Sequence, residues 1–166
     1  MNGWLTGKRV AIEGSSPAIV TALEAAGARF VEDEAEIWVH IAQPSATKPA
    51  HELTHAEWRA SMEAGLDRRF LGAKDFAASC RARGQGGAVL FVGVPEQSLG
   101  ADQAAAAGAL GNLTKTLGVE WARDGIRVNS ILTRETGDTL GPLAAYLVSD
   151  YAAYVTGAVM GITLDD

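Results

Sequence analysis

The chain has 166 residues, of which 14 are Lys or Arg and 20 are Asp or Glu, giving a formal net charge of −6. This acidic balance excludes the clustered positive charge that binding to nucleic acid or to an anionic membrane requires. The length is enough for one domain with a core of its own, so residues 1–166 are predicted to form a single unit.

Other compositional features point to a cytoplasmic protein. Cys80 is the only cysteine, which excludes an internal disulfide, and its apolar surroundings predict a buried small side chain rather than a reactive thiol. No apolar run reaches the length of a membrane span, and the N-terminus lacks the pattern of a signal peptide. The expected partners are proteins or small molecules.

The first part of the chain predicts three strands and one helix. A short apolar strand ends in a glycine, and Ser15 and Ser16 then offer N-caps ahead of Pro17, which suits the first turn of a helix. The acidic residues 32–36 connect the second and third strands and are too few for another strand and helix. The predicted elements are strands at 9–14, 29–31 and 37–41 and a helix at 17–26.

The remainder of the chain continues the alternation of helices and strands. Thr54 and Glu57 have the spacing of a capping box at the start of a long helical pattern. The strands are continuous apolar runs, which is typical of strands buried on both faces of a parallel sheet. The fold class is therefore a doubly wound α/β sheet with helices on both faces. The further predicted elements are helices at 54–83, 101–123 and 140–148 and strands at 88–92, 126–131 and 158–164.

Six segments matter through their order and spacing, and they are 5–12, the helix at Trp58, 86–90, 110–131, 146–150 and 155–157. Together they resemble the short-chain dehydrogenase/reductase family. The resemblance covers nearly the whole chain and implies a Rossmann-like sheet that lacks one strand–helix unit after Glu32. It also implies that the cover over the substrate is missing, because the segment 133–140 is much shorter than in the family.

The family binds NAD(P) through a glycine-rich first turn, and this chain departs from that pattern. The resemblance places Glu13, Gly14, Ala18 and Val20 at the family's Thr-Gly-x-x-x-Gly-x-Gly positions, so only the first glycine is kept. Side chains at the other two positions occupy space where backbone would approach a pyrophosphate. We therefore expect no bound cofactor in this chain, and NAD(P) only in a partner subunit.

The family's catalytic positions carry other residues as well. The resemblance places Gly65, Val94, Gln103 and Ala107 where the family has its Asn, Ser, Tyr and Lys. In the family the tyrosine transfers the proton and the lysine lowers its pKa, and neither glutamine nor alanine can replace them. No catalytic residue is therefore expected.

Other polar residues provide weaker candidates. His40 ends an apolar strand without an evident acidic partner, so a structural role is favoured over a replacement base. His51 and His55 have helical spacing, but a third ligand is missing and no metal site is predicted. The polar residues at the strand ends are the support for an unusual enzyme, and they are Gln43, Glu96, Gln97 and Gln103.

The two long helices suggest association with another chain. The family pairs the corresponding helices between subunits, and candidate residues here for the interface or the core are Phe70, Phe76, Leu113, Leu117 and Trp121. The run 104–107 indicates either good helix formers or a close contact between helices. The leading hypothesis is a catalytically inactive subunit that stabilises or shapes an active, full-length dehydrogenase paralogue in a hetero-oligomer. The alternatives are a homo-oligomer, an atypical NAD(P)-dependent oxidoreductase, and a sensor that binds a nucleotide or other ligand.

Overall fold

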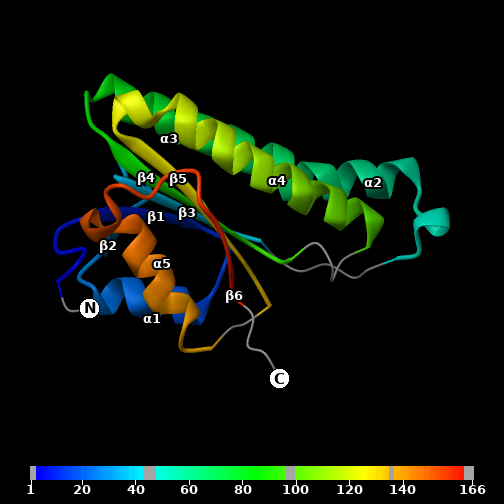
Figure 1. The fold of residues 1–166 in the computed structure, drawn as a ribbon, viewed down its shortest axis with the longest axis horizontal. Helices are drawn as coiled ribbons and strands as arrows, with labels where there is room; N and C mark the ends of the chain where they lie inside the picture. The colour runs from blue at the N-terminus through cyan, green and yellow to red at the C-terminus, as the bar shows by residue number, and fades with distance from the viewer. Residues whose placement is uncertain (1–2, 43–47, 96–99, 135–136, 163–166) are drawn as a thin grey trace.

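A computed structural model describes residues 3–42, 48–95, 100–134 and 137–162, and they form one parallel six-stranded sheet flanked by helices (Figure 1). The order across the sheet is β2-β1-β3-β4-β5-β6. The strands are β1 (Arg9–Glu13), β2 (Arg29–Phe30), β3 (Ile37–Ile41), β4 (Gly87–Gly93), β5 (Ile126–Thr133) and β6 (Val159–Ile162). The helices are α1 (Pro17–Ala25), α2 (His55–Met62), α3 (Arg68–Ala82), α4 (Ala101–Glu120) and α5 (Leu140–Val148).

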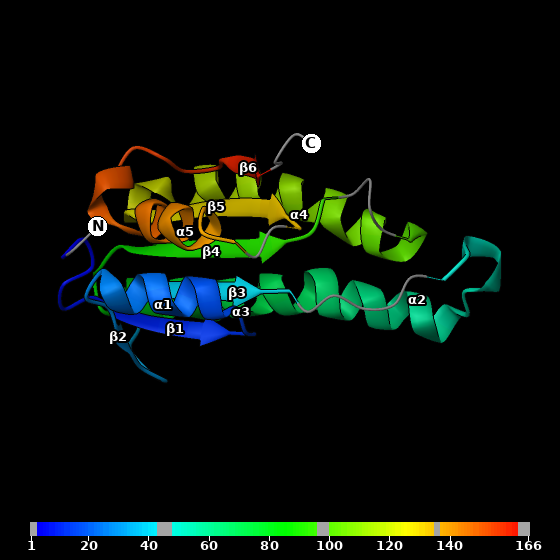
Figure 2. The ribbon, with the colours of Figure 1, turned by 90° about the horizontal axis from the view of Figure 1, so that it is seen from below.

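Helices cover both faces of the sheet, which confirms the doubly wound prediction. Helices α1 and α5 pack on one face, and α3 and α4 pack on the other (Figures 1 and 2). Each face has its own apolar core, one around Leu23, Val39 and Leu147 and the other around Phe76 and Phe91. The central strands are apolar on both sides because both sides are buried.

The predicted short connections are confirmed. Between β2 and β3 the chain has only Val31–Glu36, without another strand or helix, and β2 is the edge of the sheet among the described strands. The connection from β5 to α5 is also short, although residues 135–136 lie outside the described part. On the side of β1 that faces away from β3, the sheet therefore has only β2 among the described strands. None of the described helices has the length and apolar character needed to cross a bilayer.

The long helix predicted at 54–83 consists of α2, a π-turn at Glu63–Asp67, and α3. The predicted capping box is present, because the Thr54 side chain accepts from the Glu57 amide and Glu57 accepts from the Thr54 amide. A β-carbon added at Gly65, in the π-turn, would lie 2.8 Å from the Ala106 Cβ. The small residues of α4 thus make a close helix contact, and that contact lies within this chain.

The five candidate residues for the interface divide unequally. Phe76, Leu117 and Trp121 are 8%, 3% and 4% exposed and belong to the core under α3 and α4, so of the two predicted roles these three have the core one. Leu113 is partly buried against the same core. Phe70 is 42% exposed and remains available for contact with another chain.

Two helix glycines provide a matched test of packing on this face. A β-carbon added at Gly72 in α3 would lie 2.5 Å from Cζ2 of the buried Trp38, whereas one added at Gly111 in α4 would have no neighbour within 4 Å. We expect Gly72→Ala to lower the free energy of unfolding by about 1–3 kcal/mol through overpacking. Gly111→Ala should raise it by up to about 1 kcal/mol through helix propensity. Urea denaturation measures both, and equal effects would contradict this packing.

Candidate functional site

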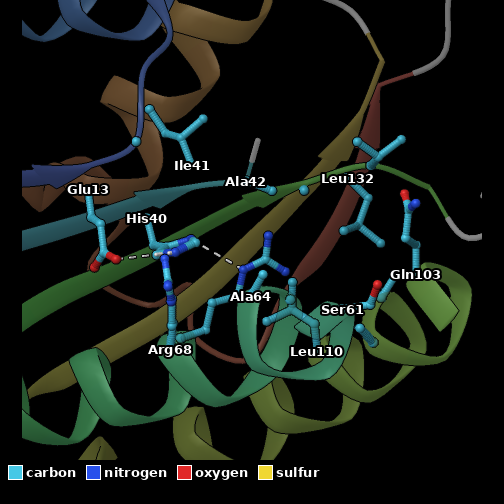
Figure 3. Close-up of a pocket in the computed structure, with 17 residues that line it drawn as sticks. Glu13, His40, Ile41, Ala42, Ser61, Ala64, Arg68, Gln103, Leu110 and Leu132 are labelled. Atoms are coloured by element: carbon cyan, nitrogen blue, oxygen red, sulfur yellow. Dashed lines mark hydrogen bonds and ion pairs between the residues drawn. The ribbon is translucent and has the colours of Figure 1, made fainter. Parts of the chain in front are cut away.

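A pocket of about 260 Å³ opens at the carboxyl ends of β1, β3, β4 and β5 (Figure 3). It lies where the sheet order reverses, since the chain adds β2 on one side of β1 and β3 on the other. Ligands of open α/β sheets bind at such a reversal. Its lining residues come from these four strand ends, from α2, α3 and α4, and from the π-turn between α2 and α3. They are Glu13, Gly14, His40, Ile41, Ala42, Ser61, Ala64, Gly65, Arg68, Arg69, Gly93, Val94, Gln103, Ala106, Ala107, Leu110 and Leu132.

The pocket brings together the positions that the resemblance identified as catalytic. Gly65 from the π-turn, Val94 after β4, and Gln103 and Ala107 from α4 all line it. Side chains at these positions are hydrogen, isopropyl, carboxamide and methyl. A proton donor or acceptor for an alcohol is therefore not available from these four residues.

His40 is 5% exposed and has an acidic neighbour, which corrects the expectation drawn from the sequence. Its Nε2 lies 3.8 Å from Oε1 of Glu13, because the two residues are opposite each other in the register of β1 and β3 (Figure 3). Its Nδ1 accepts a hydrogen bond from Nε of Arg69 at 3.3 Å. The accepting role of Nδ1 puts the ring proton of the neutral imidazole on Nε2, facing Glu13.

Burial and the neighbouring cation hold this imidazole in its neutral form. Desolvation, followed by the charge of Arg69, lowers the pKa of His40 from 6.5 to about 4. Protonation would also place a hydrogen on Nδ1 and remove the acceptor that Arg69 uses. At neutral pH His40 is consequently an acceptor for Arg69 rather than a charged acid.

Arg69 is the functional candidate that sequence reasoning missed. Its side chain comes from the first turn of α3, is 3% exposed, and donates to His40 Nδ1 and to the Val92 carbonyl at 3.3 Å. Burial lowers the pKa of Arg69 to about 10, so the guanidinium stays charged at neutral pH. An arginine pair in an otherwise apolar helical stripe was the available signal, but periodicity did not show that Arg69 points inward.

Ser61 and Asp102 form a second polar contact beside the pocket. The Ser61 hydroxyl donates to Oδ2 of Asp102, which is 4% exposed and lies in the first turn of α4. A carboxylate in that position is stabilised by the helix dipole. Its Oδ1 has no hydrogen-bond partner within the part of the chain that the structure describes.

Gly14 is required by the backbone rather than by a ligand. It has a φ of 95°, and an added β-carbon would lie 2.2 Å from the Ile41 carbonyl oxygen. The close approach of the first turn to the end of β3 therefore excludes any larger residue. Ala18 and Val20 lie in α1, are partly buried, and do not line the pocket.

Two features of the first turn are unfavourable for the pyrophosphate of a dinucleotide. Such a group needs free amides at the helix N-terminus. Here Pro17 has no N–H, and the Ser16 hydroxyl accepts from the Ile19 amide at 3.5 Å. The Glu13 carboxylate adds a negative charge at the end of β1.

The remaining sequence candidates are not joined into a site. His51 and His55 are exposed, and no group of three metal-binding side chains occurs among the residues that the structure describes. Gln43, Glu96 and Gln97 lie outside the described residues. Cys80 is buried as predicted, and this burial raises the pKa of its thiol.

Comparison with known proteins identifies the family. A family model described as enoyl-(acyl carrier protein) reductase matches residues 14–136, most of the chain. The chain belongs to the short-chain dehydrogenase/reductase family. It is similar in structure to a short-chain type dehydrogenase/reductase from Mycobacterium marinum, with a TM-score of 0.87 and 20% identity over 95% of this chain and 94% of that chain. Acetoin dehydrogenase from Enterobacter cloacae has a TM-score of 0.73 and 21% identity over 87% of this chain and 67% of that chain.

Curated members of the family are more similar in sequence. A tropinone reductase homologue from Arabidopsis thaliana is 35% identical, covering 63% of this chain and 40% of that protein. Cis-4-hydroxycyclohexanecarboxylate dehydrogenase from Sinomonas cyclohexanicum is 30% identical, covering 74% of this chain and 60% of that protein. The chain thus spans less than two thirds of the length of these two relatives.

The protonation of His40 can be measured directly. With His51→Gln and His55→Gln, the single remaining imidazole should titrate near pH 4 by NMR, well below the ordinary value of 6.5. Because the unfolded chain binds this proton first, the free energy of unfolding should fall as pH falls from 6.5 toward 4. His40→Gln in the same background should flatten this part of the stability profile. An imidazole that titrates near 6.5 would contradict the described contacts with Arg69.

Proposed function

We propose that this chain is a catalytically inactive member of the short-chain dehydrogenase/reductase family that acts as a subunit beside an active, full-length dehydrogenase. The observation that carries the proposal is the composition of the pocket. Gly65, Val94, Gln103 and Ala107 converge there from three parts of the chain, and none of their side chains titrates. The reaction that the resemblance implies needs a proton donor at this place.

The other polar groups of the pocket do not replace that donor. His40 is neutral, and its Nδ1 is engaged by Arg69. Arg69 keeps its proton at neutral pH, so it supplies charge but not proton transfer. The first turn also has a proline and a capped amide, and Glu13 precedes it, which supports a chain without its own NAD(P).

Exposed apolar surface on the helical layer supports association. Trp58, Phe70 and Leu71 are 37%, 42% and 49% exposed, and they lie on α2 and α3. Helix α2 has eight residues and buries none of them within this chain. Helices this short are marginal without tertiary contacts. Figures 1 and 2 show α2 and the start of α4 extending past the strands, where another chain could pack against them.

Association can be tested with charge substitutions on this layer. We expect tagged protein from its native source to carry a full-length dehydrogenase in native mass spectrometry. Leu71→Glu should weaken the complex at least about tenfold, since it places a charge in an apolar contact. Tyr154→Glu is the matched control, because Tyr154 is fully exposed and lies outside the helical layer. A chain that remains alone, or a complex equally sensitive to both changes, would refute the subunit role.

Catalysis needs a separate test, because the alternative of an atypical NAD(P)-dependent oxidoreductase uses the same pocket. We expect the isolated chain to oxidise NADH and NADPH only at the background rate with a panel of ketones and aldehydes. Gln103→Ala should leave that rate unchanged. A rate above background that falls in Gln103→Ala would establish the alternative and overturn the assignment as inactive.

A further inference from the structure

The pocket contains a buried positive charge whose described partners are neutral. Arg69 is 3% exposed, and its guanidinium donates to an imidazole nitrogen and a backbone carbonyl. Within the described part of the chain, no carboxylate lies within 4.0 Å of its nitrogens. Buried charges in proteins are ordinarily paired, because desolvation is costly. Among the described residues the guanidinium therefore has no counterion, and it lines a pocket.

At the end of β4, the Arg69 guanidinium packs close to apolar side chains. A β-carbon added at Gly93 would lie 3.5 Å from Nη2 of Arg69 and 3.3 and 3.6 Å from methyl carbons of Leu132 and Leu110. The end of β4 thus presents one charged donor group next to two apolar side chains at the same point. All four residues line the 260 Å³ pocket.

We propose that this pocket binds a small organic monocarboxylate, with its carboxylate on Arg69 and its short apolar body against Leu110 and Leu132. A planar guanidinium matches a carboxylate in geometry and charge. Val94, Ala106 and Ala107 extend the apolar wall. The volume suits a molecule of a few carbon atoms rather than a dinucleotide. The proposal concerns binding, and it holds whether or not the chain associates with a dehydrogenase.

The charges around the pocket favour a monoanion over a phosphate. Arg68 also lines the pocket, but it is largely exposed and lies 4.0 Å from Glu63, which offsets its charge. Glu13 contributes a negative charge on the His40 side (Figure 3). The buried charged groups here are one cation, Arg69, and the Asp102 carboxylate beside Ser61. A single cation matches the single charge of a carboxylate better than the double charge of a phosphate.

Three probes separate the charge of the ligand from its shape. Isothermal titration calorimetry of the full chain should detect binding of butyrate. Butyramide, which has the same shape without the charge, should bind at least about tenfold more weakly. Inorganic phosphate should also bind more weakly than butyrate. Chemical shifts of the Gly93 and Leu132 amides should move with butyrate, which places the ligand in this pocket.

Substitution of Arg69 tests the assignment. Arg69→Met should weaken butyrate binding at least about tenfold, because it removes the charge that the carboxylate contacts. Arg59→Gln is the matched control, since Arg59 is an exposed arginine of α2 paired with Asp67. Arg69→Lys keeps the charge but loses the planar fork, so it should bind more weakly than the native chain. That variant provides the test if Arg69→Met does not fold.

The outcomes are distinct. Loss of butyrate binding in the Arg69 variants, with Arg59→Gln unaffected, supports the site. No butyrate binding, equal binding of butyrate and butyramide, or stronger binding of phosphate would overturn the monocarboxylate assignment. Unchanged binding in Arg69→Lys and Arg69→Met would overturn the role of Arg69. Failure of the chain to associate with a dehydrogenase would leave these results unaffected.

Discussion

Strands β1 and β3 pair in parallel from Val10 opposite Ile37 to Glu13 opposite His40, and much of the molecule depends on this register. The short connection between β2 and β3 brings the chain directly to the far side of β1, so the sheet reverses its order there. The same pairing holds the first turn against the end of β3 so closely that only a glycine fits at position 14. The pocket lies where these two strands end, so Glu13 and the His40 imidazole both line it.

The sequence predicted the strands and helices well, but it did not predict a contact that depends on this register. Continuous apolar runs predicted the central strands, and Ser16 and the Thr54 capping box predicted the starts of two helices that the structure contains. The contact between Glu13 and His40 was missed because it depends on which residues of two strands lie opposite each other. Local patterns define the elements, whereas cross-strand register is set by packing of the whole sheet.

The inward orientation of Arg69 was missed for a related reason. It neighbours Arg68 in sequence, yet Arg68 is exposed and Arg69 is buried, so residue type alone did not separate them. The π-turn at Glu63–Asp67 precedes α3 and shifts its face relative to α2, which a single helical pattern over 54–83 does not show. The four residues that the resemblance singled out, Gly65, Val94, Gln103 and Ala107, do line one pocket. A resemblance compares whole folds, whereas periodicity describes one element at a time.

The open pocket itself bears on what the chain does. Association alone does not require a pocket at the strand ends, and larger side chains at Ala106 and Ala107 would reduce it. The Arg69 guanidinium lines this pocket and is held there by neutral acceptors. An anionic ligand would supply the counterion that Arg69 does not have among the described residues. Binding without catalysis is therefore compatible with a subunit that associates, because the pocket opens at the strand ends and the exposed apolar residues lie on the outer surface of α2 and α3.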